Sequence, residues 1–328
     1  MERDYKSRGT MKRKGNLYEQ IISIPNLQMA DMKARKGKGY QKSIVSHDKN
    51  RGPNIINLHH TLKNHKFVTS PYQTFIIKEP KERLIYRLPY YPDRIVQHAI
   101  MIVTKPYFVS TFTSDTYSCI KGRGVHKAVY KLQNTLLDKW NTKYYLKIDI
   151  KKFYPNIDHT ILKQLLRKKF KDNDLLFLLD GIIDSADGLP IGNYLSQYLA
   201  NFYLAYFDHW IKEIQKVIYY FRYADDMIFF SNSKKFLHSL LHNIKDYLKE
   251  KLNLVLKPNY RIVPMYCGLD FLGYVFYHGY TRVRKGIKQA CARMVSSIPT
   301  ISSIYAYIGW FCHANTINLQ NKLIYGRN

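Results

Sequence analysis

The stretch "YYFRYADDMIFF" (residues 219–230) places two adjacent carboxylates, Asp225 and Asp226, inside an otherwise aromatic and aliphatic run. The flanking runs have the composition of buried strands, so the segment predicts strand, turn and strand. Charged groups in such a run are costly to bury unless something positive lies against them. At the tip of a hairpin, both carboxylates can face a groove instead of the core.

A third carboxylate, Asp149, ends another apolar strand, "KYYLKIDI" (143–150). If these strands are neighbours, three carboxylates meet at one edge of a sheet. Like charges repel unless a divalent cation neutralises them, and hard oxygen ligands suit Mg²⁺. Two such ions would support in-line phosphoryl transfer. The alternative is chance, because the 29 Tyr residues make a Tyr-x-Asp-Asp string easy to meet.

Charge and composition narrow the class of protein. The 328 residues are 46% hydrophobic, enough for a large core, and 52 Lys and Arg against 24 Asp and Glu give a net charge of +28. Such a chain most often binds a polyanion, with nucleic acid as the leading candidate and a basic enzyme without that partner as the alternative. Without a membrane-length apolar run or a signal peptide, we expect a cytoplasmic protein that does not bind a membrane.

The cysteines and histidines show no metal-binding pattern. The 12 His form no HExxH or HxH arrangement, and the cysteines lie far apart without a CxxC pair. The sequence therefore predicts no zinc site and no disulfide framework, but reduced, mostly buried thiols. The four cysteines are Cys119, Cys267, Cys291 and Cys312.

Strands and helices mix without strict βαβ alternation, which favours an α+β fold. Residues 1–15 are basic and predicted to be disordered. The predicted elements are two or three helices in 17–66 with a basic break, "KARKGKGYQK", at 33–42; a β-hairpin in 72–90; a helix that starts near Pro92; further helices at 158–170 and 235–251; one long amphipathic helix within 189–214; short strands near 254–258 and 270–276; and helices from about Gly286.

Five motifs, in order along the chain, resemble those of the reverse transcriptase family. "YADD" (223–226) resembles the catalytic turn, and "DIKKFYPNIDH" (149–159) resembles the motif with the first catalytic Asp. The other three are "KERLIYRLPYYPDRIVQHAI" (81–100) for the fingers, "LPIGNYLSQYLANFYL" (189–204) for the nucleotide pocket, and "GLDFLGYVF" (268–276) for the primer grip. Five motifs in the right order are far more specific than any one of them.

The resemblance implies a right-hand polymerase architecture. After the basic tail (1–15), N-terminal helices and fingers would occupy residues 16–142. The palm, an antiparallel sheet with flanking helices, would occupy 143–267, and the primer grip with a short helical thumb 268–328.

The resemblance also implies an RNA-directed DNA polymerase that binds template RNA, the RNA/cDNA duplex and dNTPs. Its metal ligands would be the side chains of Asp149, Asp225 and Asp226 and the carbonyl of Ile150. They would hold two Mg²⁺ ions, for which Mn²⁺ can substitute, while a primer 3′-OH attacks the α-phosphate of a dNTP.

Further site residues follow from the same motifs. Tyr154 would be the aromatic gate against a ribose 2′-OH, with an ordinary core tyrosine as the alternative. Arg83, and less directly Lys78 or Lys81, would bind the incoming phosphates. The remaining assigned positions are Lys152 and Phe153, whose N–H groups would face the triphosphate, Ile191 and Gly192 in the nucleotide pocket, and Phe271, Leu272 and Gly273 in the primer grip. Arg123 would contact the template, unless it belongs to an ordinary glycine turn before a helix.

The pocket turn resembles one lineage in particular. Many relatives, including group II intron and retron enzymes, carry Gln before the Gly and Ser-Pro further on, whereas this chain has Ile191-Gly192 and Ser196-Gln197. That string resembles the reverse transcriptases of diversity-generating retroelements, which copy a template RNA with errors at adenines and work with a small basic ring-forming accessory protein. The alternatives are a retron, group II intron or abortive-infection reverse transcriptase, and an inactive RNA-binding scaffold.

The lysine that many polymerases use to protonate pyrophosphate is not clearly placed by the sequence. Lys257, in "KLNLVLKPNYRIVP" (251–264), is the nearest candidate.

Overall fold

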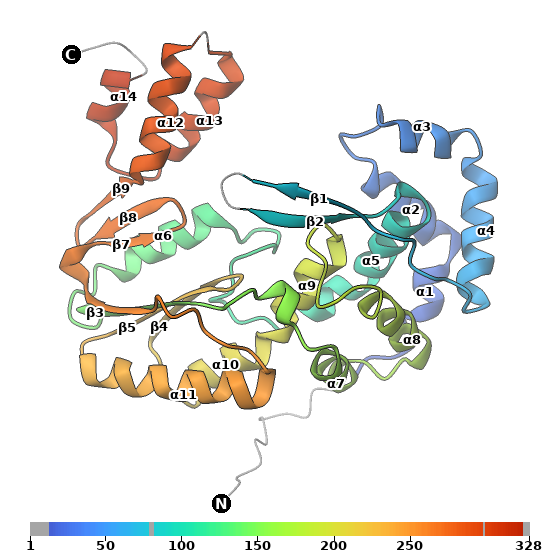
Figure 1. The fold of residues 1–328 in the computed structure, drawn as a ribbon, viewed down its shortest axis with the longest axis horizontal. Helices are drawn as coiled ribbons and strands as arrows, with labels where there is room; N and C mark the ends of the chain where they lie inside the picture. Colours follow the sequence, from blue (N-terminus) through green and yellow to red (C-terminus); the bar gives the residue numbers. More distant parts are fainter. Residues whose placement is uncertain (1–12, 79–81, 298, 324–328) are drawn as a thin grey trace, which may run out of the picture. The chain divides into compact units, whose positions relative to one another are not determined.

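The computed structural model describes residues 13–78, 82–297 and 299–323 and divides into two compact units that interleave along the chain. Unit 1 contains the chain up to Phe112, together with Lys152–Tyr206 and Glu250–Leu254. Unit 2 contains Thr113–Lys151, Phe207–Lys249 and the chain from Val255. Figure 1 labels most of the helices and strands of both units.

Unit 1 is built around α5 (Ile95–Val109), whose sequence IVQHAIMIVTKPYFV is apolar on nearly every side. A helix of this composition belongs in a core, and α5 packs against α1, α2 and α9. Four short helices replace the two or three expected before residue 66. Besides α5, unit 1 contains the helices α1 (Tyr18–Ile22), α2 (Ile24–Ala34), α3 (Lys42–Asp48), α4 (Arg51–Lys63), α7 (His159–Lys169), α8 (Asn173–Ile183) and α9 (Tyr194–Tyr203).

The predicted hairpin is confirmed. Strands β1 (Gln73–Ile77) and β2 (Arg83–Arg87) pair antiparallel, with Gln73 opposite Arg87 and Ile77 opposite Arg83. The segment η1 (Tyr90–Arg94) then leads directly into α5, with a kink at Tyr91, whose backbone is not helical (φ −106°, ψ 134°).

The ordered chain begins earlier than the sequence predicts. Of the predicted disordered tail, residues 1–12 lie outside the described chain, but Lys14 forms a parallel bridge with Phe170. The Lys14 N–H donates to the Lys169 carbonyl at 2.9 Å, and the Lys171 N–H donates to the Lys14 carbonyl at 2.8 Å. These hydrogen bonds satisfy backbone groups that a disordered tail would leave to water.

Unit 2 contains a four-stranded antiparallel sheet in the order β4-β5-β3-β6. The predicted strands at 143–150 and 219–231 are confirmed, whereas β6 was not predicted because it is only four residues long. The strand predicted near 254–258 is wrong: this segment has only an isolated bridge between Leu256 and Ile150. The strands are β3 (Tyr144–Asp149), β4 (Tyr219–Tyr223), β5 (Asp226–Ser231) and β6 (Arg261–Pro264).

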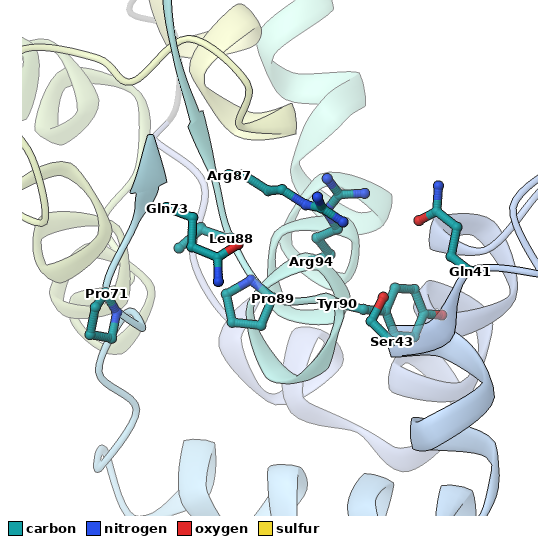
Figure 2. A pocket seen from close by; sticks show the side chains of 9 residues that line it. All are labelled: Gln41, Ser43, Pro71, Gln73, Arg87, Leu88, Pro89, Tyr90 and Arg94. Carbon is teal, nitrogen blue, oxygen red and sulfur yellow. The ribbon is translucent and has the colours of Figure 1, made fainter. Parts of the chain in front are cut away.

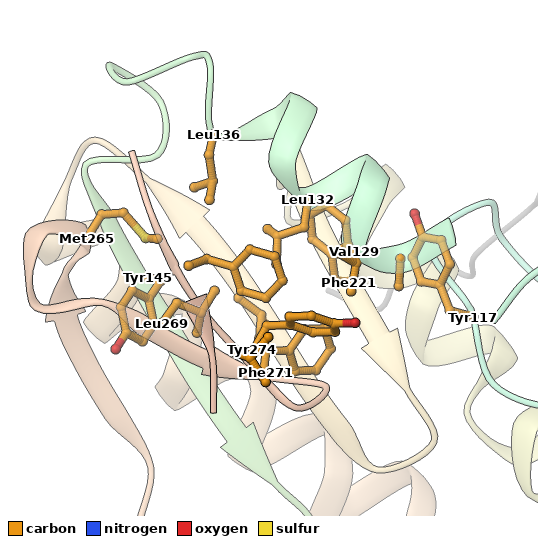
Figure 3. Packing of buried hydrophobic residues seen from close by; sticks show 14 of the residues in the cluster. Tyr117, Val129, Leu132, Leu136, Tyr145, Phe221, Met265, Leu269, Phe271 and Tyr274 are labelled. Carbon is orange, nitrogen blue, oxygen red and sulfur yellow. The ribbon is translucent and has the colours of Figure 1, made fainter. Parts of the chain in front are cut away.

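The two faces of this sheet pack against different partners. Tyr145 and Phe221 face a core formed with Leu132 of α6 (Val125–Thr135) and with a second sheet (Figure 3). On the opposite face, the Tyr220 hydroxyl donates to Asp208 of α10 (Ala205–Glu213) at 2.8 Å. Alternation along β3, β4 and β5 therefore buries both faces.

The second sheet has the order β7-β8-β9, and β9 was not predicted. Its strands are β7 (Leu269–Phe271), β8 (Tyr274–Tyr277) and β9 (Tyr280–Val283). The predicted C-terminal helices follow as α12 (Lys285–Ser296), α13 (Ile301–Phe311) and α14 (Ile317–Leu323). No helix of the described chain has the length and apolar character needed to cross a membrane.

Two further expectations need correction. The single long helix after the pocket turn is interrupted at Leu204 and forms α9 and α10, while the predicted helix near 235–251 forms α11 (Lys234–Leu252). The thiols are free but not mostly buried: Cys291 is buried, whereas three are exposed because they lie in turns or at a helix end. The exposed thiols are Cys119, Cys267 and Cys312.

Candidate active site

The register of the main sheet brings the three predicted carboxylates together within unit 2. Asp149, the last residue of β3, lies directly opposite Asp226, the first residue of β5. Ala224 and Asp225 form the two-residue connection between β4 and β5. Ala224 has a φ of 56°, and its N–H donates to the Ser118 hydroxyl at 3.0 Å, which fixes the turn.

Burial and mutual repulsion raise the pKa of two of these carboxyls. Burial is the larger cause for Asp225, followed by the charge of Asp149, and the pKa rises to about 6. Burial also raises the pKa of Asp226 to about 6, with Lys147 acting in the opposite direction and Asp149 adding to the rise. Crowded carboxylates in this state bind a cation more readily than they accept further negative charge.

Two lysines already lie against the carboxylates. The Lys257 ammonium forms an ion pair with Asp149 Oδ2, and the Lys257 N–H donates to the Asp149 carbonyl at 2.8 Å. Lys147 Nζ lies 3.7 Å from Asp226 Oδ2. The structure therefore places Lys257, which the sequence left open, at the first carboxylate of the site.

The donor set fits a hard divalent cation. Asp149 Oδ1 and Asp226 Oδ1 are both buried, and neither has a hydrogen-bond partner within the described residues. Ile150 and Leu256 form an isolated antiparallel β-bridge. Its two hydrogen bonds run from the Lys151 N–H to the Val255 carbonyl and from the Lys257 N–H to the Asp149 carbonyl, so neither uses the Ile150 carbonyl. Over the same residues, no three His, Cys, Asp or Glu side chains form a ready-made metal cluster. Oxygen donors of this kind suit Mg²⁺ or Mn²⁺.

A buried ion pair next to the turn was missed by the sequence analysis. Arg222 and Asp208 are both fully buried, and Arg222 Nη2 lies 2.5 Å from Asp208 Oδ2. Thr116 and Tyr220 donate to the same carboxylate at 2.9 and 2.8 Å. The available signal was Arg222 itself, a charge inside the apolar run "YYFRY" that requires a buried partner.

The segment after β3 belongs to unit 1. Lys152 is exposed with a φ of 45°, Phe153 is buried, and Tyr154 is half-buried at the start of η2 (Tyr154–Asn156). The Tyr154 carbonyl accepts the Leu189 N–H at 2.9 Å. A side chain on Gly188 would meet this carbonyl at 2.5 Å, so glycine permits the close approach.

The predicted pocket turn packs on the hairpin of the same unit. The Ile191 carbonyl accepts the Tyr86 N–H at 2.8 Å. At Gly192, φ is 126° and an added Cβ would lie 2.2 Å from the Tyr86 carbonyl, so only glycine fits. On the hairpin, Lys78 and Arg83 are exposed, whereas Lys81 lies outside the described residues.

The predicted primer grip is the tight turn between β7 and β8 in unit 2. Phe271 is buried, and Leu272 and Gly273 have φ values of 50° and 87°, as a two-residue hairpin turn of type I′ requires. A Cβ on Gly273 would lie 2.5 Å from the Trp310 ring.

Arg123 has a structural role in its own unit. Its Nη1 donates to the carbonyl of Thr113 at 2.5 Å, which ties down the loop before Thr116. Contact between Arg123 and a template stays a prediction.

The comparisons with known proteins identify the family of this chain. Residues 76–276 match the family described as "Reverse transcriptase (RNA-dependent DNA polymerase)". The chain belongs to this family and contains an RNA-directed DNA polymerase domain.

Its relatives come from several lineages. The chain is 25% identical over 258 residues to Protein YkfC of Escherichia coli K12, which covers 65% of this chain and 66% of the relative. It is 24% identical to the group II intron-encoded protein LtrA of Lactococcus lactis, over 47% of this chain and 28% of LtrA. The retron Ec73 reverse transcriptase of E. coli is 32% identical over 41% of this chain and 45% of the relative. The chain thus spans less than two thirds of each of these relatives.

Solved structures give the same fold. Apo telomerase from Candida tropicalis matches with a TM-score of 0.53 and 13% identity, over 77% of this chain and 54% of telomerase. Telomerase from Candida albicans, in complex with a fragment of telomeric RNA, matches with a TM-score of 0.51 and 10% identity, over 83% and 61%. The predicted α+β fold of right-hand polymerases is confirmed.

Proposed function

We propose that the protein is an RNA-directed DNA polymerase that copies a template RNA into cDNA. The observation that carries this proposal is the group of carboxylates at the β3 end and the β4–β5 turn, with two buried oxygens that lack a partner among the described residues. Asp149, Asp225 and Asp226, with the Ile150 carbonyl, would hold two Mg²⁺ ions or Mn²⁺ in their place. When bound, the ions would lower the cost of bringing a primer 3′-OH and a dNTP α-phosphate together.

The chain's own residues would bind and orient the substrates. The exposed Arg83 and Lys78 would bind phosphate oxygens, and the backbone of Lys152 and Phe153 would donate to the triphosphate. Tyr154 would exclude a ribose 2′-OH by its ring. Phe271 and the turn Leu272-Gly273 would support the primer strand, since positive φ angles at both turn residues give a rigid hairpin end.

Primer extension tests this proposal directly. Purified protein with poly(rA)/oligo(dT), dTTP and Mg²⁺ should make DNA, and excess EDTA should abolish synthesis. Absence of synthesis with Mg²⁺ and with Mn²⁺, by a protein that still binds RNA, would favour the alternative of an inactive RNA-binding scaffold.

As a finer proposal, we infer that the enzyme is the mutagenic reverse transcriptase of a diversity-generating retroelement. The support is Ile191 before Gly192, with Ser196-Gln197 further on. Isoleucine offers the nucleotide no side-chain donor or acceptor, whereas glutamine would offer both. A retron or group II intron type of enzyme, as among the relatives above, is the competing assignment.

Sequencing of cDNA made on one adenine-containing RNA tests the finer proposal. A lost hydrogen bond is worth about 0.5–1.5 kcal/mol, which corresponds to a several-fold change in discrimination. Ile191→Gln should therefore lower errors opposite adenine several-fold and keep most activity, whereas Ile191→Val should keep the parent error rate. Equal error rates for Ile191→Gln and the parent would contradict the proposal.

The accessory protein is a second arm of the same assignment. Co-expression with the neighbouring small open reading frame and a pull-down should recover a complex. Lack of a complex at micromolar concentrations would count against the retroelement lineage while leaving the polymerase proposal intact.

A further inference from the structure

A cavity of about 280 Å³ lies within unit 1, at the point where β2 passes into η1. Its volume is several times the ~30 Å³ that one water occupies in the liquid. Five of the nine residues that line it carry polar or cationic side chains, and Figure 2 shows them beside Pro71, Leu88, Pro89 and Tyr90. These five are Gln41, Ser43, Gln73, Arg87 and Arg94.

The two arginines are the chemical core of this cavity. Their guanidinium groups lie side by side in Figure 2, with Arg87 reaching in from β2 and Arg94 from the end of η1. Arg87 is exposed, whereas Arg94 is half-buried. Burial and the neighbouring charge of Arg87 both lower the pKa of Arg94, so the like charges are close enough to repel each other.

Neither arginine is neutralised by a carboxylate among the described residues, because the ion pairs of this region involve other cations. Asp31, which accepts the Tyr90 hydroxyl beside the cavity, is held by Arg35 at 2.8 Å and by Arg51 at 2.7 Å. Two adjacent guanidinium groups without an acid form a strong oxyanion site, since each can donate two parallel hydrogen bonds.

The basic break "KARKGKGYQK" (33–42), which the polymerase motifs do not explain, runs beside this cavity and contributes Gln41 to its lining. Two lysines of this segment act on a half-buried histidine. Burial is the largest cause that lowers the pKa of His98 to about 4, followed by the charges of Arg94, Lys38 and Lys33. Tyr40, the residue before Gln41 in the same segment, is 82% exposed. Unpaired bases stack on exposed aromatic rings that accompany cationic phosphate-binding sites.

We propose that this cavity binds one backbone phosphate of a single-stranded polynucleotide, with Arg87 and Arg94 donating to its oxygens. Gln41, Gln73 and Ser43 supply further donors from the walls. The adjacent base stacks on Tyr40. The inference rests on the proposed function, which supplies the template RNA as the ligand. Phosphate contacts of this kind hold a strand in place and read no sequence.

The test is the salt dependence of RNA binding by the full chain. Binding is measured by fluorescence anisotropy with a labelled oligo(A) RNA. Its length of about 20 nucleotides exceeds the ~4–16 nucleotides that a single site covers. The double variant Arg87→Gln/Arg94→Gln should bind about fivefold to tenfold more weakly, and the slope of log Kd against log salt should fall by about 0.7, the value for one phosphate on a single strand.

A control removes equal charge elsewhere. The double variant Lys235→Gln/Lys249→Gln changes two exposed lysines on α11. It should keep the parent slope of log Kd against log salt. The inference is overturned if the arginine variant, with an unchanged melting temperature, keeps the parent affinity and slope, or if the control loses as much.

A second pair of variants keeps the test sound if the arginine variant misfolds. Gln73 is exposed on β1, so its replacement should not disturb the core. Gln73→Glu places a negative charge at the cavity and should weaken RNA binding several-fold, whereas Gln73→Ala should stay within twofold of the parent. Equal affinities for these two variants would contradict the proposal.

Free phosphate is the other source of the same chemistry, and inorganic phosphate serves as its probe. If inorganic phosphate raises the melting temperature of the parent but not of Arg87→Gln/Arg94→Gln, while both bind RNA equally, the ligand is free phosphate and the polynucleotide assignment is wrong. Primer extension separates the two proposals. If the parent extends a primer but Arg87→Gln/Arg94→Gln has the salt slope of the parent, only the phosphate site is contradicted. If the parent is inactive in primer extension but the arginine variant shows the expected lower slope, only the polymerase proposal is contradicted.

Discussion

Unit 2 contains two carboxylate sites that differ in how far their oxygens are satisfied by hydrogen bonds: Asp208 alone, and the group with Asp149 and Asp226. Asp208 is fully buried, and its oxygens accept hydrogen bonds from Arg222, Tyr220 and Thr116. Asp149 and Asp226 keep 32% and 33% of their side-chain surface exposed, yet each has one buried oxygen without a partner in the described chain.

The difference separates architecture from function. A buried charge with every lone pair satisfied holds elements together and has little capacity left for a ligand. Carboxylates that are crowded and only partly neutralised raise the free energy of the protein until a cation arrives. Both groups border the same strand pair, so Arg222 and its hydrogen bonds fix the turn on which Asp225 is presented.

The largest expected effect is on the unsatisfied group. Asp225→Ala removes a proposed metal ligand and should lower primer extension more than about 1,000-fold. RNA binding should stay close to the parent value, because Asp225 contributes no positive charge. Since repulsion with Asp149 is relieved, the melting temperature in EDTA should stay equal or rise. Extension at the parent rate would show that the carboxylates are not the catalytic site.

The satisfied group should respond in stability. Asp208→Ala leaves the Arg222 guanidinium buried without its counter-ion and should cost roughly 3–5 kcal/mol in the free energy of unfolding, measured with urea. Replacing both partners, as in Asp208→Leu/Arg222→Met, should cost much less than the single change. If Asp208→Ala unfolds at the parent urea concentration, the pair is not a structural support.

Thermal melting with and without Mg²⁺ should show that the site with Asp225 binds the ion. Mg²⁺ at about ten times its dissociation constant stabilises the folded state by about 1.4 kcal/mol through mass action. The melting temperature of the parent should rise accordingly, and that of Asp225→Ala should not. A Lys235→Gln control, which changes an exposed lysine of α11 outside the proposed metal ligands, should respond like the parent. An equal response of Asp225→Ala would place the ion elsewhere.

The smallest expected effect is a pH dependence in EDTA. The pKa of Asp225 and Asp226 is about 6 in the folded state and about 4 in the unfolded chain, so folding favours the protonated forms. The stability from these groups is present below pH ~4 and is lost as the pH rises to about 6. Between these values, the melting temperature of the parent should fall by about 1–3 °C relative to Asp225→Asn, in which one titration is absent. Parallel curves would mean that the carboxylates are ordinary surface acids.

Local patterns predicted the carboxylates well. The nearly continuous apolar runs in "KYYLKIDI" and "YYFRYADDMIFF" are strong enough to define β3, β4 and β5, and Asp149, Asp225 and Asp226 lie where these runs end or are interrupted. The pairing of β3 with β5, which brings Asp149 opposite Asp226, had to be assumed.

Long-range partners could not be predicted. Lys257 lies 108 residues from Asp149, and nothing in its own neighbourhood indicates a carboxylate. Arg222 and Asp208 are separated by a helix end and a loop, so a charged residue in each segment gave no sign that they pair. The short strands β6 and β9 were missed because four residues carry too little alternation.

The positive φ of 56° at Ala224 sets two selective pressures against each other. An L-residue in this conformation costs roughly 1–2 kcal/mol, and glycine would adopt it freely. Selection for stability alone would therefore replace the alanine. Glycine, however, would also let the turn sample other conformations, so that Asp225 would be held less precisely. A population under pressure for heat tolerance should admit glycine here, whereas one under pressure for polymerase speed should keep a side chain.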